Sequence, residues 1–486
     1  MKSLQTGRSK CSRSECEIEH RRAAKGPIRV HAGFSKDLMR QLLLLIAVIV
    51  AVPVFAFSQN STAPDSIQSL TLAQCIDFAM QHQPGLNQSL VNRAIVSTTN
   101  SINLAGWMPQ VSLTGNMTHY YQLPTSFAAS STPGGAPIES HPGVTNTAIP
   151  EFSASQAIFD PQLLYAARSA PSTLRQAEQS TDSARISVVS TVSKSFYSLL
   201  LTLEQISVLK EDTARLSRNV MDTYHQSVGG IVDETDYEQA VIALNNSKAQ
   251  LKQQMENVVP QYAALKQLMG CPPEKQFNVV FDTVQMMQEI AYDTTQALQY
   301  EKRIEYQQIQ TAKTLQHERT MYYEFSFLPS VSAVYNYYYE FENNSSANLF
   351  KTAYPYSYFG LSFSFPLFTG FSRVENLHKS MLQEEVLDWA EKNLRSQIYT
   401  EYTTALANYR SNLYSWQLLK ENRGRASNVY RVVSLQYNQG IVAYLNMIVA
   451  ESNLITAEIG YLNALFQLLS SKIDLEKAMG EIPHIH

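Results

Sequence analysis

The 486-residue chain is poor in glycine, cysteine and charge. Its 18 glycines suit long helices, because each helical glycine costs about 1 kcal/mol relative to alanine. Four cysteines are too few for a disulfide scaffold. Charged residues make up 16% and hydrophobic residues 44%, which excludes both a disordered chain and a protein made only of membrane helices.

The sequence also lacks the motifs of common enzyme chemistry. It contains no glycine-rich phosphate loop, no nucleophile elbow and no histidine–glutamate pair at zinc-site spacing. We therefore expect no catalytic residue, no cofactor and no metal. Residues 1–40 hold ten Lys/Arg and four Asp/Glu, which leaves 28 and 38 in residues 41–486. This acidic remainder argues against nucleic-acid binding.

One uninterrupted apolar run, Leu42–Phe57, follows Arg40. It is short for a membrane-spanning helix and ends at Ala56-Phe57-Ser58, with small residues at positions −3 and −1. We predict that residues 1–58 are an N-terminal extension and signal peptide, rather than a membrane anchor. Cys75 and Cys271 then remain as inert thiols, or less favourably as a disulfide.

The remaining sequence contains an internal repeat. The tripeptides at Gly230 and Gly440 are identical and 210 residues apart, and the Met-Gly pairs ending at Gly270 and Gly480 have the same offset. Ordered landmarks at one offset indicate a duplication. We predict a first repeat over 59–270, a linker over 271–295 and a second repeat over 296–486.

Each repeat has the same predicted order of elements. A helix precedes a Pro-initiated stretch in which apolar and polar residues alternate, which predicts β-hairpins over 110–159 and 329–368. Their second strands begin near Glu151 and Tyr356, after polar loops at 124–150 and 343–357. Long helices follow. Their predicted spans are 160–228, 231–270, 372–438 and 441–480.

Capping residues support these helices. Thr71 with Gln74, and Ser372 with Glu375, have the spacing of a capping box, and Asp160 precedes a first-turn proline. Helices of about 70 residues are roughly 100 Å long, far more than a bilayer is thick. We therefore expect an α+β membrane protein whose helices project into the periplasm as a coiled coil.

Four strands cannot close a membrane barrel, because the smallest barrels have about eight. Lipid cannot satisfy the N–H and C=O groups of an open edge, so several chains must share the barrel. The geometry allows two or three chains. Tyrosines near the loop end of the second hairpin predict an aromatic girdle at the outer-membrane lipid boundary, with ordinary strand preference as the alternative. The proposed girdle residues are Tyr335, Tyr337, Tyr339, Tyr356 and Tyr358.

The ordered duplicate motifs resemble those of the TolC-like outer-membrane efflux channels. The likeness covers about residues 68–482. It rests on the strand starts at Pro109 and Pro329, the segment 363–370 (Phe-Ser-Phe-Pro-Leu-Phe-Thr-Gly) and the Met-Gly helix ends. It implies a homotrimer with a twelve-stranded barrel and a helical tunnel. It also implies a periplasmic adaptor and an inner-membrane transporter of the RND, ABC or MFS type as partners.

The resemblance further implies that the tunnel closes at the helix tips beside Gly230 and Gly440. Tyr437 and Asp236 match a closing network, although its arginine position holds Val442. The positions of an acidic ring hold Asn446 and Val449. As a separate hypothesis, acidic residues near the first tip replace that ring and favour cations, or else they only favour a helix N-terminus. These residues are Asp233, Glu234, Asp236 and Glu238.

The expected function is thus a passive outer-membrane exit duct for drugs, toxic compounds or metals. Type I protein secretion is the alternative within the same resemblance. An adhesive coiled-coil protein would explain the long helices but not two amphipathic hairpins at matched positions.

Overall fold

The computed structural model describes residues 69–128, 136–280, 290 and 292–482. All of them belong to one compact unit, Ser66–His486. The predicted signal peptide and its cleavage site lie outside the described residues. The division of the chain at residues 58, 270 and 295 therefore stays a prediction.

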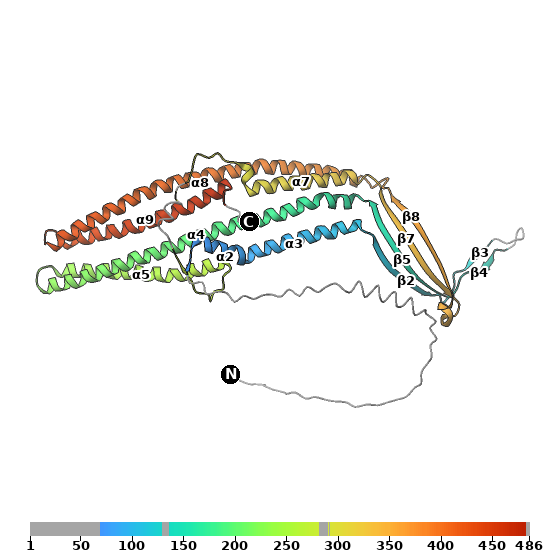
Figure 1. The fold of residues 1–486 in the computed structure, drawn as a ribbon, viewed down its shortest axis with the longest axis horizontal. Coiled ribbons are helices and arrows are strands. Elements are labelled where there is room, and N and C mark those ends of the chain that lie inside the picture. The colour runs from blue at the N-terminus through green and yellow to red at the C-terminus, as the bar shows by residue number, and fades with distance from the viewer. Residues whose placement is uncertain (1–68, 129–135, 281–289, 291, 483–486) are drawn as a thin grey trace, which may run out of the picture. The chain divides into compact units, whose positions relative to one another are not determined.

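Two similar series of elements follow each other along the chain (Figure 1). The first is α2 (Leu72–His82), α3 (Pro84–Leu104), β2 (Gln110–His119), β5 (Asn146–Phe159), α4 (Pro161–Val228) and α5 (Glu234–Met269). The second is α7 (Ile304–Phe325), β7 (Ser330–Asn343), β8 (Ala353–Ser364), α8 (Ser372–Asn438) and α9 (Tyr444–Met479). The fold thus shows the predicted two-fold internal repeat.

The helix starts depend on local capping. Thr71 accepts from the backbone N–H of Gln74, whose side chain accepts from the N–H of Thr71, so the predicted capping box is confirmed. Asp160 accepts from the first-turn N–H groups of α4, also as predicted. The capping box predicted at Ser372 is wrong. Gly370 and Phe371 both adopt positive φ, which turns the chain one residue early and makes Ser372 the first helical residue.

The strands β2, β5, β7 and β8 form one antiparallel sheet in that spatial order. β5 begins at Asn146 and β8 at Ala353, earlier than predicted, and the second loop, 344–352, is shorter than expected. β8 also ends at Ser364, before the predicted Phe368, because Pro366 has no N–H for a ladder hydrogen bond. The first loop carries a small hairpin, β3 (Ser126–Ala128) with β4 (Ile138–Ser140).

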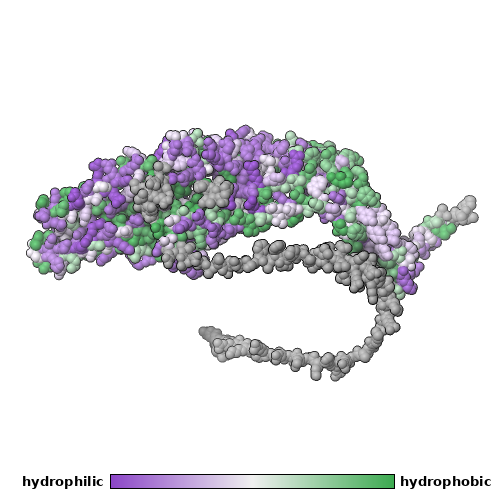
Figure 2. All heavy atoms as spheres, in the orientation of Figure 1, coloured by the Kyte–Doolittle hydropathy of each residue, from purple (hydrophilic) through white to green (hydrophobic). Residues whose placement is uncertain are grey.

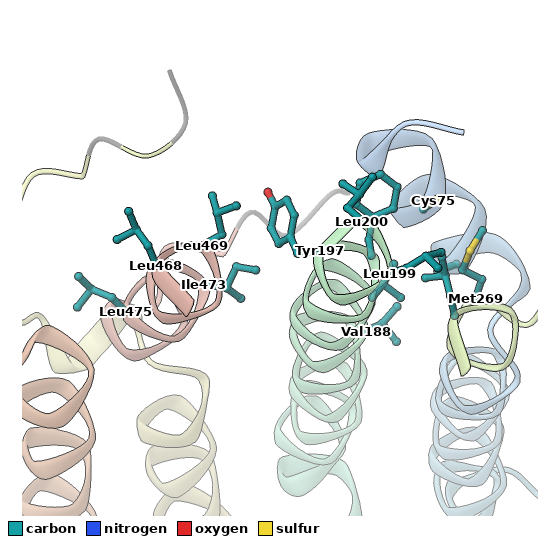
Figure 3. Close-up of a cluster of buried hydrophobic side chains, with 14 of the residues drawn as sticks. Cys75, Val188, Tyr197, Leu199, Leu200, Met269, Leu468, Leu469, Ile473 and Leu475 are labelled. Atoms are coloured by element: carbon teal, nitrogen blue, oxygen red, sulfur yellow. The ribbon is translucent and has the colours of Figure 1, made fainter. Parts of the chain in front are cut away.

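A single large apolar cluster lies where α2, α4, α5 and α9 meet. Figure 3 shows Leu199 and Leu200 of α4 near Cys75 and Met269, with Leu468 and Leu469 on α9. Cys75 and Cys271 are both free thiols, which confirms the favoured interpretation for this pair. One stretch of α4 is apolar enough to cross a bilayer, but 61% of it is buried inside the protein. Its apolar character is explained by this core.

The helices form two antiparallel hairpins, α4–α5 and α8–α9, which lie side by side (Figure 1). Helix α4 joins the second hairpin through a row of polar contacts, three with α9 and one, at Tyr437, with α8. Lys194 pairs with Asp474, Gln205 with Asn463, Arg215 with Glu451 and Gln226 with Tyr437. Beyond the large core, the contact between hairpins therefore relies strongly on polar groups.

Candidate functional site: the two faces of the sheet and the helix tips

The two faces of the four-stranded sheet differ in chemistry. One face is apolar: Val111, Leu113, Met117, Phe152, Val331, Tyr335, Tyr337, Tyr339, Phe359, Leu361 and Phe363. The opposite face is polar: Ser112, Thr114, Asn116, Glu151, Ser153, Ser332, Asn336, Tyr338, Glu340, Glu342, Tyr356, Tyr358 and Ser362. Most of the apolar side chains are widely exposed, with Leu113 at 76% and Phe359 at 71%. An exposed apolar sheet face of this extent fits contact with lipid.

The strand register divides the five tyrosines predicted as a girdle. Tyr335, Tyr337 and Tyr339 lie on the apolar face, as a lipid-facing girdle requires. Tyr356 and Tyr358 lie on the polar face, because Tyr356 is directly opposite Tyr338. These two residues therefore cannot belong to the same girdle. The prediction groups the five tyrosines because they lie near the same loop. Side chains point alternately to the two faces along each strand, so tyrosines of β7 and β8 can lie on opposite faces.

The sheet has two open edges. β2 pairs only with β5, and β8 only with β7, in the part of the chain that the structure describes. Each edge therefore carries a row of backbone groups with no strand partner, 10 residues long in β2 and 12 in β8. Such rows are tolerated in lipid only when another strand pairs with them.

Hydrophobic residues gather on the visible face at the junction of the sheet and the helices. Figure 2 shows green side chains gathered where α3, α4, α7 and α8 approach the strands. Leu367, Phe368 and Phe371 are 86%, 77% and 68% exposed there. These residues extend the apolar surface beyond the strand ends, at the level where a bilayer would end.

The two helix tips are built alike. Gly230 and Gly440 adopt positive φ, and the N–H of the following isoleucine donates to a carbonyl five residues back. This arrangement ends a helix tightly and requires a residue without a Cβ. Ile231 and Ile441, at the turns themselves, are 76% and 69% exposed.

The predicted closing residues lie together at these tips. The Tyr437 hydroxyl donates to Oε1 of Gln226 over 3.0 Å, which joins the two hairpins. Burial, and then the Asp236 and Asp222 carboxylates, raise the pKa of Tyr437. Tyr437 therefore stays protonated and remains a donor. Val442 is half-buried and offers no charge to Asp236.

The acidic residues of the first tip have separate local roles. Asp233 caps α5: the backbone N–H and hydroxyl of Thr235 donate to its carboxylate and lower its pKa. Glu234 and Glu238 are exposed, whereas Asp236 is half-buried. Asn446 and Val449 are exposed on one side of α9. Capping of α5 therefore explains an acidic residue at position 233.

A buried cluster of charged side chains, which was not predicted from the sequence, lies below the tips. Asp212 and Glu451 are 3% and 2% exposed, and both lie near Arg215. Ser247 donates to Asp212 over 2.7 Å, and Asn219 donates to Glu451 over 3.1 Å. Burial, and then the Asp212 charge, raise the pKa of Glu451 to about 7. A groove of about 740 Å³ between α5 and α9 adjoins this cluster.

The Asp212–Arg215 spacing is visible in the sequence as an (i, i+3) pair, but Glu451 joins it only through the packing of α9 on α4. No group of His, Cys, Asp or Glu within the described ranges is arranged to hold a metal.

Comparison with known proteins identifies one family. The model of the outer membrane efflux protein family matches residues 76–271 and 324–481. Comparison with curated protein sequences finds no match.

Three solved channels are similar in structure. VceC from Vibrio cholerae aligns with a TM-score of 0.66 and 16% identity, covering 84% of this chain and 96% of VceC. The outer membrane channel CmeC from Campylobacter jejuni aligns at 0.68 and 16%, covering 85% and 87%. The open state of the Neisseria gonorrhoeae channel MtrE aligns at 0.67 and 18%, covering 84% and 88%. At these identities the structural matches establish the fold.

Proposed function

Because the chain belongs to the outer membrane efflux protein family, whose members are outer-membrane channels and not enzymes, we propose that it is the exit duct of a three-part export system. Three copies close a twelve-stranded barrel in the outer membrane, and their helices continue it into the periplasm. Transport through the duct is passive. An inner-membrane transporter of the RND, ABC or MFS class supplies the energy and hands over drugs, toxic compounds or metals through a periplasmic adaptor.

One observation carries this proposal: a sheet with an apolar face and two open edges continues directly into helices much longer than a bilayer. The open edges of β2 and β8 demand neighbouring strands if the sheet lies in lipid. The α4–α5 and α8–α9 hairpins then lie around the same axis as the barrel. A polar inner face of the sheet would line the passage, as it does in other membrane barrels.

The helix tips are the proposed contact with the adaptor and the proposed constriction. Ile231 and Ile441 supply exposed apolar contacts at the ends of the hairpins. We propose that Glu234, Asp236 and Glu238 supply the acidic groups of the constriction. Three copies around one axis would repel anions and favour cations.

An accumulation assay in the parent bacterium tests the function. Removing the gene should raise the cellular content of a small fluorescent dye, and restoring the wild-type gene should reverse the change. Secreted proteins in the medium should stay unchanged. If a secreted protein disappears from the medium while dye content is unaffected, the chain serves type I protein secretion instead. If neither changes, the export proposal fails.

Single-channel recording tests the constriction. The variant Glu234→Gln/Asp236→Asn/Glu238→Gln removes the three proposed carboxylates and leaves the capping side chain of Asp233 in place. We expect the ratio of cation to anion permeability to fall relative to wild type. The matched control Glu256→Gln removes an exposed carboxylate far from the tip on the same helix α5. An unchanged ratio in the tip variant would exclude the acidic constriction.

A further inference from the structure

We propose that the polar face of the sheet carries a binding site for planar organic cations, formed by Tyr338, Tyr356 and Tyr358 together with nearby carboxylates. The inference rests on the proposed function, because it requires this face to line a barrel. It adds a site within the passage and a class of ligand that this site would hold.

Three tyrosines form a stacked group on a face that is otherwise polar. The ring centroids of Tyr338 and Tyr356 are 4.7 Å apart with planes inclined by 13°, and those of Tyr338 and Tyr358 are 6.2 Å apart at 22°. Asn336 donates to the Tyr358 hydroxyl over 2.6 Å, and Ser153 donates to Asn336 over 2.8 Å. These bonds orient the group, while Tyr356 and Tyr358 remain 47% and 48% exposed.

The charge on this face is negative and unbalanced. The four strands β2, β5, β7 and β8 contain no lysine or arginine. Their three acidic residues are Glu151, Glu340 and Glu342, and the register places all three on the same face as the stacked tyrosines. Glu151 is directly opposite Tyr338. None of these carboxylates takes part in an ion pair within the described residues.

This combination selects a particular ligand chemistry. The face of a tyrosine ring attracts a cation, and a flat aromatic ligand also stacks on it. The carboxylates supply attraction for positive charge, which is stronger in a narrow passage than in open water. A small hydrated cation gains little from the rings, and an aromatic anion is repelled by the carboxylates. A planar aromatic cation satisfies both features.

Current block in planar bilayers tests this site, with N-methylquinolinium as the probe. Tetramethylammonium has the same charge without the flat ring, and naphthalene sulfonate has the ring with the opposite charge. Each is added on the side of the strand loops. We expect N-methylquinolinium to halve the single-channel current at a concentration at least tenfold lower than either comparison ion.

Two variants locate the block. Tyr338→Leu/Tyr356→Leu/Tyr358→Leu should raise the half-blocking concentration about tenfold, the loss expected from one to two cation–π contacts. The matched control carries the same three changes on the opposite face, at Tyr335, Tyr337 and Tyr339, and should block like wild type.

The outcomes separate this inference from the proposed function. Equal block in both tyrosine variants would refute the site, and so would equal block by tetramethylammonium. If the triple tyrosine variant of the polar face does not assemble, Glu151→Gln/Glu340→Gln/Glu342→Gln tests the site instead. This variant keeps the tyrosine rings, and its half-blocking concentration should also rise. Channels that conduct without selective block refute only this inference, whereas the absence of any channel refutes the proposed function.

Discussion

Replacing Glu451 with glutamine should stabilise the protein at alkaline pH and reduce the dependence of its stability on pH. Glu451 is 2% exposed, and burial raises its pKa from 4.5 to about 7 despite the nearby Arg215. The cost of burying the charge therefore exceeds the attraction of the arginine. Glutamine has nearly the same shape and keeps a side-chain oxygen to accept from Asn219.

The pKa shift sets the sign and size of the effect. Below about pH 4.5 the carboxyl group is protonated in both folded and unfolded chains, so its contribution to stability is fully present. As pH rises through 7, the folded chain must lose a proton that it holds more tightly than the unfolded chain does. The free energy of unfolding then falls by about 3 kcal/mol per chain. Asp212, whose pKa burial also raises, adds a slope of the same sign.

The assay is the thermal unfolding temperature of the detergent-solubilised protein between pH 5 and pH 8. The wild-type temperature should fall over this range, whereas Glu451→Gln should fall less and lie higher at pH 8. Glu421→Gln, an exposed change on the adjacent helix α8, serves as the matched control and should follow the wild type. If Glu451→Gln instead lowers the unfolding temperature at pH 8 and keeps the wild-type slope, the ion pair with Arg215 outweighs burial and the reasoning is wrong.

Three substitutions and the addition of reductant are tested by thermal unfolding. Gly270→Ala should be strongly destabilising, because φ is +69° and a Cβ would lie 2.3 Å from the carbonyl oxygen at the C-terminus of α2. Gly424→Ala should instead stabilise the protein by about 1 kcal/mol, because Gly424 lies within α8 and faces open space. Equal changes of the unfolding temperature in the two glycine variants would contradict the left-handed backbone conformation at Gly270. Arg303→Met should cost about 1–3 kcal/mol, because the carbonyl oxygen of Ala478 loses its donor, whereas the Glu305 and Glu401 carboxylates are 36% and 60% exposed and can bind water. A neutral effect would show that this carbonyl finds another donor. Reductant should leave the unfolding temperature unchanged, because Cys75 and Cys271 are free thiols; a decrease would indicate a disulfide.

The repeated architecture was predictable from the sequence because its signals are local. Proline breaks, capping residues and changes of hydrophobic period identify the helices and strands without knowledge of their partners. Asp160 shows this, since its cap depends only on residues in the first turn of α4. Ser372 shows the limit: its capping pattern is present, but the positive φ of the preceding residue shifts the helix start.

The features that depend on contacts between distant segments were not predictable. The cross-strand partner of Tyr356, Tyr338, is set by the register between β7 and β8, and no property of the β8 segment alone determines that register. The cluster around Glu451 requires α9 to pack against α4, since Glu451 and Arg215 are 236 positions apart in the sequence. Local signals, namely the Asp160 cap before α4 and the tip glycine before α9, predicted both helices, yet they carried no information on which residues would meet.

Native mass spectrometry of the purified protein in detergent tests the central claim most directly, because it counts the chains that share one sheet. The open edges of β2 and β8 predict a stable particle of more than one chain, three in the proposed function, that loses solubility when detergent is removed. A single folded chain that stays monodisperse in buffer without detergent would show that its edges need no partner, and the channel interpretation would be wrong.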